Sequence, residues 1–211
     1  MRYCFLAGPH VREPKILFRR ASLLRDRDAL VAFDRKVFGT DAFDPEEWDD
    51  YEAYWMIANG ERIGCCAFKP DVDLRDHQRD SPPLLGSLYI VSTGILPEYQ
   101  GKGFGEHFKR WQIGWAQQNG FWQIVTNSRK SNRPMIALNQ KVGFRLAWTS
   151  TRNYCYLPAE KAVAMKLILP KRKGQAARSV LTWRILAMLA EQRNRFDRAI
   201  EALTASGPTP R

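Results

Sequence analysis

The stretch GILPEYQGKGFG, residues 94–105, decides the fold of this chain. The residues before it, 84–96, predict a strand, and residues 103–119 place large aromatic side chains at helical spacing, which predicts an amphipathic helix. Three alternating glycines in the loop between them let the backbone turn tightly and bring amide N–H groups close to a ligand. The N–H groups and positive dipole end of the new helix face the same point, and Lys102 adds a cation. The segment therefore predicts an anion site fit for a pyrophosphate.

Two common nucleotide-binding motifs do not fit this loop. The pattern GxGxxG needs a third glycine at 106 or 108, where the sequence has Glu106 and Phe108. The Walker A pattern fails because no Gly-Lys-Ser/Thr follows at the required spacing. The pattern that remains is Gln100-x-x-Gly103-x-Gly105.

Outward from this loop, strand and helix patterns alternate along the chain. Strands are predicted at 16–19, 54–58, 62–68, 84–96, 121–126, 144–150 and 163–169, and helices at 26–38, from 44, at 103–119 and at 134–142. Asn59-Gly60 predicts a type I′ hairpin turn. This order predicts an α/β domain with one mixed sheet of six to seven strands and helices on both faces. We expect an N-terminal arm at 1–14, the domain at 15–170, and a basic extension at 171–211 with a helix over about 177–204.

Composition and charge exclude several classes of protein. Hydrophobic residues make up 45% and charged residues 26% of the 211 residues, as in a globular chain. The formal net charge is +11, and most of the excess lies after residue 170. No apolar run is long enough for a membrane span or a signal-peptide core. The four cysteines form no CxxC pair and the three histidines are scattered, so we expect no metal and a reduced, cytoplasmic protein.

The glycine loop and a second segment together carry a family resemblance. Asn132-x-x-Met135-x-x-Leu138-Asn139-x-Lys141-x-Gly143-Phe144 follows about 27 residues after the loop. Both segments resemble the motifs of the GCN5-related N-acetyltransferases, the GNAT superfamily. The resemblance is sharp over residues 84–146 and extends in outline over 16–169. It implies the acyl-CoA N-acyltransferase fold, with acetyl-CoA as co-substrate and no metal.

The resemblance also implies roles for particular residues. The strand before the loop would hydrogen-bond the pantetheine arm, with an N–H near Leu96 stabilising the oxyanion of the thioester carbonyl. Asn132 would contact the pantetheine or β-alanine portion. The cofactor-binding residues expected on this basis are Gly94, Ile95 and Leu96 of the strand, Gln100, Gly101, Lys102, Gly103, Phe104 and Gly105 of the loop, and Asn132.

One residue departs from the family pattern and leaves the catalytic acid open. The family commonly has Tyr at the position of Asn139, where the phenol protonates the leaving thiolate, and an amide cannot serve as an acid. Another group replaces that Tyr, the acid is not needed, or the protein binds CoA without turnover. Tyr154 and Tyr156 are candidate substitutes. No general base is evident, since Glu98 and Glu106 beside a helix N-terminus suit the helix dipole.

The sequence leaves the identity of the acceptor substrate open. Seven of the twelve residues at 41–52 are acidic, a region that often walls the acceptor site in this family, so a cationic amine is one hypothesis and a solvated acidic face the other. We expect an amine acceptor, small molecule or protein, and no membrane partner; nucleic acid at the basic extension is the less favoured reading, and a homodimer stays open. The alternative function is a catalytically weak CoA-binding or RNA-associated module on the same fold.

Overall fold

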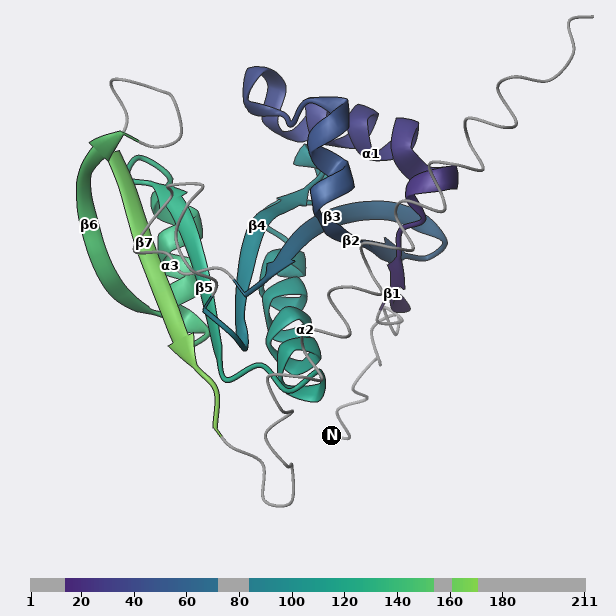
Figure 1. Cartoon of the computed structure of the whole chain (residues 1–211). Coiled ribbons are helices and arrows are strands. Elements are labelled where there is room, and N and C mark those ends of the chain that lie inside the picture. Colours follow the sequence, from purple (N-terminus) through teal and green to yellow (C-terminus); the bar gives the residue numbers. More distant parts are fainter. Residues whose placement is uncertain (1–13, 72–83, 154–160, 171–211) are drawn as a thin grey trace, which may run out of the picture.

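The computed structural model describes residues 14–71, 84–153 and 161–170, and for 148–153 and 161 it describes the backbone alone. Residues 1–13 of the expected N-terminal arm, the basic extension at 171–211, and Tyr154 and Tyr156 lie outside the described residues. The described part forms one seven-stranded sheet in the order β1-β2-β3-β4-β5-β7-β6 (Figure 1). The strands are β1 (Ile16–Arg20), β2 (Glu52–Ala58), β3 (Glu61–Pro70), β4 (Ser87–Ile95), β5 (Gln123–Arg129), β6 (Arg145–Asn153) and β7 (Lys161–Ile168).

The sheet is mixed, as the sequence predicts. β4 and β5 pair in parallel, joined by a helical crossover, and every other neighbouring pair of strands is antiparallel. The predicted hairpin between β2 and β3 is confirmed. Asn59 and Gly60 both adopt positive φ angles, 52° and 89°, as a type I′ turn requires.

Helices cover both faces of the sheet. Neighbouring side chains of a strand point to opposite faces, so β4 separates the two helix layers. A Cβ at Gly94 would meet Val37 and Phe38 of α1 (Leu23–Phe38), whereas Thr93 contacts α2 (Phe104–Gln118). Helix α3 (Arg133–Lys141) packs beside α2, with Leu138 3.3 Å from a Cβ built at Gly105.

Two elements differ from the sequence prediction in ways that matter for the site. The helix predicted from residue 44 is the short 3₁₀ helix η2 (Pro45–Asp50), which ends because Tyr51 is already extended and leads into β2. It follows another 3₁₀ turn, η1 (Gly39–Asp41), that closes α1. Strand β5 runs to Arg129 rather than to residue 126, because its polar end keeps pairing with β7.

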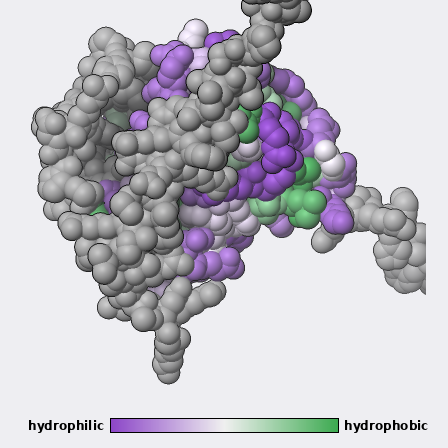
Figure 2. Space-filling model, turned by 45° about the vertical axis from the view of Figure 1, so that its right-hand side comes forward, coloured by the Kyte–Doolittle hydropathy of each residue, from purple (hydrophilic) through white to green (hydrophobic). Residues whose placement is uncertain are grey.

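The core lies in two layers, one on each side of the sheet. The adjacent Cys65 and Cys66 are both buried free thiols and belong to different layers, as alternation along a strand predicts. The largest buried side chains include Trp48, Trp55 and Phe108. In Figure 2 the surface not drawn in grey is mostly hydrophilic, with smaller apolar areas between. No helix in the described ranges is long and apolar enough to cross a membrane.

Candidate functional site

The central feature of the site is the place where two parallel strands separate. Residues Ser87–Ile90 of β4 pair with Gln123–Thr126 of β5, and beyond them β4 pairs with β3 alone and β5 with β7 alone. The hydroxyl of Thr126 donates to the carbonyl of Ile90 at 3.1 Å, where the pairing ends. Val91 follows as an extra residue opposite β3, since the β3–β4 register steps from Ile90 to Ser92. The two strands therefore splay apart from this point.

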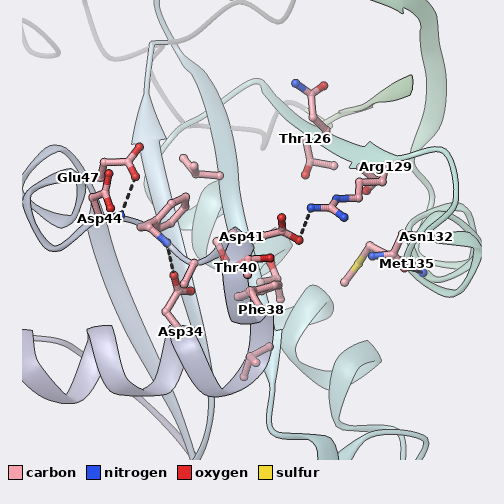
Figure 3. Close-up of a pocket in the computed structure, with 18 of the residues that line it drawn as sticks. Asp34, Phe38, Thr40, Asp41, Asp44, Glu47, Thr126, Arg129, Asn132 and Met135 are labelled. Atoms are coloured by element: carbon pink, nitrogen blue, oxygen red, sulfur yellow. Dashed lines mark hydrogen bonds and ion pairs between the residues drawn. The ribbon is translucent and has the colours of Figure 1, made fainter. Parts of the chain in front are cut away.

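A cavity of about 600 Å³ occupies the splayed region. Its walls come from four parts of the chain that are distant in sequence (Figure 3). The segment that contains η1 and η2, residues 39–50, is called the 3₁₀ segment. The residues that line the cavity include Asp34 of α1, Asp41, Asp44 and Glu47 of the 3₁₀ segment, Val91, Ser92 and Thr93 of β4, Lys109 of α2, Thr126 and Arg129 of β5, and Asn132 and Met135 of α3. Asp41 and Arg129 form an ion pair that joins the 3₁₀ segment to the end of β5.

The predicted anion loop lies between β4 and α2. Gly101 and Gly103 have φ angles of 73° and 86°, a region that side chains with a Cβ rarely adopt. The first intrahelical bond of α2 runs from the N–H of His107 to the carbonyl of Gly103, so the N–H groups of residues 104–106 have no acceptor within the helix. Gly105 serves a different purpose from the other two, because it lets α3 approach α2.

The backbone N–H and the side-chain amide of Gln100 both form hydrogen bonds within the protein. Its N–H donates to the carbonyl of Pro97 at 3.2 Å, and its Nε2 donates to the carbonyl of Ile95 at 2.9 Å. Gln100 therefore fixes the turn from β4 into the loop, and the amides open to an anion are those of residues 101–106. Lys102 is exposed beside them, with its ammonium 5.6 Å from the ring centre of Tyr99.

The open edge of β4 is set by hydrogen-bond alternation. The N–H of Leu96 donates to Ile63 of β3 at 2.9 Å, so the oxyanion role expected near Leu96 is not available to that N–H. Gly94 shares this orientation, because alternate residues of an antiparallel strand face the same neighbour. Thr93 and Ile95 consequently direct their backbone groups toward the splayed side, and of the expected trio 94–96 only Ile95 lies at the open edge.

The two asparagines of the second motif have different surroundings. Asn132 caps α3, since its Oδ1 accepts the N–H of Met135 at 3.2 Å, and it lines the cavity. Asn139 is fully buried, and neither its Oδ1 nor its Nδ2 has a hydrogen-bond partner among the residues that the structure describes. Asn139 does not line the cavity. The residue at the Tyr position thus supplies neither an acid nor a contact with the cavity.

The seven acids at 41–52 do not all face the cavity. Three of them line the cavity, and three others form ion pairs elsewhere: Asp49 with Arg27, Asp50 with Lys69, and Glu52 with Arg20. Glu46 is exposed and does not line the cavity. The cavity acids are fixed in place, because the N–H of Asp44 donates to Glu47 at 2.9 Å in a capping box.

Asp34 adds a buried carboxylate to the same wall. It is 3% exposed, and its Oδ2 accepts the N–H of Phe43 at 2.7 Å. No Lys or Arg of the described residues forms an ion pair with it in the structure. Burial is the main cause that raises the pKa of Asp34 to about 6, and nearby Glu47 raises it further. The group is therefore ionised at neutral pH and close to accepting a proton.

Lys109 lies opposite these acids, on the α2 side of the sheet. It is 1% exposed, and its Nζ donates to the hydroxyl of Thr93 at 3.2 Å. Gln112 donates to the same hydroxyl at 3.0 Å. Burial lowers the pKa of Lys109 to about 8. The cavity thus holds a buried carboxylate and a buried ammonium on the two sides of the sheet.

The loop acids predicted as poor candidates for a base are both in ion pairs. Glu98 pairs with Lys36, and Glu106 pairs with Arg110 and Lys141. These partners lower the pKa of both carboxyls, which keeps them ionised and weakly basic. No group of three or more His, Cys, Asp or Glu side chains in the described ranges is arranged to hold a metal ion.

The sequence motifs do not identify Asp34 or Lys109 as site residues. The available signal is an ionisable residue inside an apolar helical pattern: Asp34 follows Leu30, Val31 and Phe33, and Lys109 follows Phe108. Such a position predicts burial of the charge, which is costly unless a partner or a function compensates for it.

The chain is similar to known acetyltransferases in sequence. The family model described as the acetyltransferase (GNAT) family matches residues 25–144. A mycothiol acetyltransferase of Paenarthrobacter aurescens (strain TC1) is 32% identical over 102 residues, which are 47% of this chain and 29% of that protein. One from Arthrobacter sp. (strain FB24) is 32% identical over 62 residues, 29% of this chain and 19% of that protein. The matches thus span less than a third of these relatives.

Solved structures share the fold at low identity. The ribosomal-protein-S18-alanine N-acetyltransferase from Escherichia coli has a TM-score of 0.60 at 18% identity, covering 77% of this chain and 99% of that one. A Bacillus subtilis acetyltransferase in complex with CoA has a TM-score of 0.57 at 19% identity, covering 74% and 100%. At these identities the likeness concerns the fold, and it confirms the predicted architecture.

Proposed function

This chain belongs to the acetyltransferase (GNAT) family, and from that premise we propose that it moves an acetyl group from acetyl-CoA to a primary amine. The amine would attack the thioester directly while both substrates are bound. The single observation that carries the proposal is the cavity in the splay of β4 and β5, with the glycine loop at its β4 side. Holding amine and thioester together in such a space supplies much of the rate of an acyl transfer.

The cofactor end of the proposal rests on the loop and the open strand edge. The free amides of residues 101–106 and the N-terminus of α2 favour a diphosphate. An extended pantetheine arm would add to the open edge of β4 at Thr93 and at the N–H of Ile95, whose carbonyl accepts Gln100, with Asn132 across the splay. The thioester, at the far end of the arm from the diphosphate, would then lie toward Val91 and Thr93, where the cavity is.

The acceptor end rests on the acids. Asp34, Asp41, Asp44 and Glu47 line the cavity, and they outnumber its cations, Lys109 and Arg129. We therefore propose that the acceptor is a cationic amine that enters from the 3₁₀ segment. A bound ammonium must lose its proton before it can attack, and Asp34, with a pKa of about 6, is suited to accept one near neutral pH.

The second candidate is a CoA-binding module with little turnover, favoured by one observation. Asn139 is buried away from the cavity and carries no proton that it can donate as an acid. The two functions predict the same CoA binding and different thiol release. Screening amines for release of CoA thiol from acetyl-CoA separates them: release that depends on an amine supports the enzyme, and binding without release supports the module.

The binding step is tested with a matched pair of glycine variants. Gly103→Val and Gly60→Val both place a Cβ at a positive φ, 86° and 89°, with no atom within 4 Å of it. The backbone strain is therefore comparable, whereas only Gly103 belongs to the anion loop. Calorimetry with CoA should show at least about tenfold weaker binding for Gly103→Val, from the loss of one or two charge-assisted hydrogen bonds, and wild-type binding for Gly60→Val.

Two results would contradict the proposal. The first is no heat from the wild-type protein with either CoA or acetyl-CoA. The second is equal CoA binding by the two glycine variants, because the diphosphate would then lie elsewhere.

A further inference from the structure

Lys109 is a buried cation that the family resemblance does not explain. The residue is almost completely buried, and its ammonium donates a hydrogen bond to a neutral hydroxyl, that of Thr93. A buried ammonium without a carboxylate is costly to the fold. It is retained on the helix face that points into the splay of β4 and β5. No carboxylate among the described residues forms an ion pair with Lys109, so a negative charge that arrives with the substrates would compensate for the buried ammonium.

Acyl transfer from a thioester produces such a charge at the moment of reaction. The amine nitrogen bonds to the carbonyl carbon, and the C–S bond then breaks with its electron pair on sulfur. The departing CoA thiolate has a pKa near that of a cysteine thiol, about 8.5, and is best released with a proton. The position that normally supplies this proton in the family is Asn139, which cannot supply it.

We propose that the ammonium of Lys109 is the general acid that protonates the departing thiolate of CoA. The inference rests on the proposed function. The proton moves from Nζ to sulfur as the C–S bond breaks, leaving free CoA and a neutral Lys109. Asp34 first passes the proton of the bound ammonium to solvent, and its carboxylate then takes the second proton, which the amine nitrogen loses after it has bonded to the carbonyl carbon. After the products depart, solvent removes that proton from Asp34 and protonates Lys109 again. Atoms and charges balance without any further reactant.

The placement of Lys109 matches this role. Thr93 joins it to the open edge of β4, where the acyl end of an extended cofactor would lie, and α2 carries both Lys109 and the anion loop. A single helix would thus hold the diphosphate at its first turn and the acid in its second. With a pKa of about 8, Lys109 is protonated at neutral pH and close in acidity to the thiol it would serve.

The charged groups around Lys109 have less effect on its pKa than burial does. Cys66 of β3 is the one described ionisable group whose charge acts on its pKa. From α2 and β4 it meets the neutral Gln112 and Thr93. Across the cavity, Arg129 is paired with Asp41, and Asp34 lies on the α1 side of the sheet. Burial is therefore the dominant influence on its titration.

The test uses two substitutions with different proton chemistry. Lys109→Met removes the charge and keeps the length of the side chain, and Lys109→Arg keeps a charge that does not release a proton near neutral pH. Both should lower kcat at pH 7 by about 10²-fold or more and leave the binding of CoA near that of the wild type. The kcat of the wild type should fall above pH 8 as Lys109 loses its proton, and neither variant should show that fall. Lys166→Met, at an exposed residue of β7, is the control.

The outcomes separate this inference from the proposed function. A wild-type protein that transfers no acetyl group contradicts the proposed function. A wild type that transfers it, with Lys109→Arg at full kcat, overturns the acid role and leaves a role for charge alone. A gain of 42 Da on Lys109 during turnover, the mass of one acetyl group by its formula, would overturn it too, since the amine would then be a nucleophile. If Lys109→Met does not fold, Lys109→Arg and the wild-type pH profile still decide.

Discussion

The two ends of α1 each bury an aspartate, and the two carboxylates have opposite environments. Asp26 and Asp34 are eight positions apart, about 12 Å along the helix. Asp26 accepts the N–H of Ser22 and pairs with Arg62 and Arg19, which together keep its pKa below the usual value despite the opposing effect of burial. Asp34 accepts one N–H and pairs with none of the described Lys or Arg side chains, and its pKa is raised to about 6.

The difference shows how a carboxylate of the scaffold is told apart from one of the site. At Asp26 the fold supplies positive charge, so the ion contributes to stability. No described cation pairs with Asp34, whose carboxylate lies on the wall of the cavity. A buried charge without a partner lowers the stability of the fold, and such groups are found mainly at functional sites. Variants of Asp26 and Asp34 test this difference between the two carboxylates.

The largest expected effect concerns catalysis. Asp34→Asn keeps the acceptor for the Phe43 N–H and removes the base, so kcat/KM should fall by about 10²-fold or more. The wild-type kcat should fall below pH 6, where Asp34 becomes protonated, and the variant should lack this fall. Asp26→Asn should keep its kcat at a temperature where it is folded. Equal losses in the two variants would erase the distinction between them.

The second prediction concerns stability, where the two variants should differ in sign. A raised folded-state pKa means that Asp34 stabilises the fold only when protonated, and this contribution is lost as the pH rises from about 4 through about 6. At pH 7 the ionised group opposes folding, by up to about 3 kcal/mol for a shift of two pKa units. Asp34→Asn should therefore raise the free energy of unfolding at pH 7.

The Asp26 contribution has the reverse pH dependence. Its lowered pKa means that the stability it provides is present above about pH 4 and is lost as the pH falls through the folded-state value. Asp26→Asn should cost about 1–3 kcal/mol at pH 7, since it leaves Arg62 without the carboxylate with which it pairs. Denaturant titrations at pH 7 and pH 4 measure both variants, and Asp28→Asn, exposed on the same helix, is the control. Changes of the same sign at pH 7 would contradict the comparison.

Local sequence patterns predicted part of the site, and the part that depends on long-range strand pairing could not be predicted. The glycine loop, the Asn-Gly hairpin and the helix-capping Asn132 are contiguous patterns whose backbone geometry follows from local chemistry, and the structure has the loop and the turn where they were expected. In contrast, the cavity depends on where β4 leaves β5, at Thr126, and that point is set by the bulge at Val91 and by the pairing of β5 with β7. No local pattern encodes such long-range pairing.

Residues that act across the splay were therefore not predictable as a set. The helical spacing places Asp34 on the buried face of α1, together with Leu30 and Val31, and gives no sign of a role in a site. Only the tertiary structure shows that Arg62 pairs with Asp26 and not with Asp34. Leu96 illustrates the reverse case. Its place at the end of a strand suggested a free N–H, but the register with β3 uses that N–H for Ile63.

The smallest expected effect concerns the acids at the cavity mouth. Asp44→Asn and Glu47→Gln each remove one exposed charge from the cavity wall, so the KM of a cationic amine should rise about two- to fivefold per substitution, with little change in kcat. The increase should shrink in high salt, because exposed charges are screened over about 10 Å at 0.1 M. Asp49→Asn and Asp50→Asn, which lie outside the cavity in the same 3₁₀ helix, are matched controls. Equal KM changes in both pairs would show that the segment acts through net charge, and an unchanged KM in all four would remove the cationic acceptor while leaving Asp34 as the base.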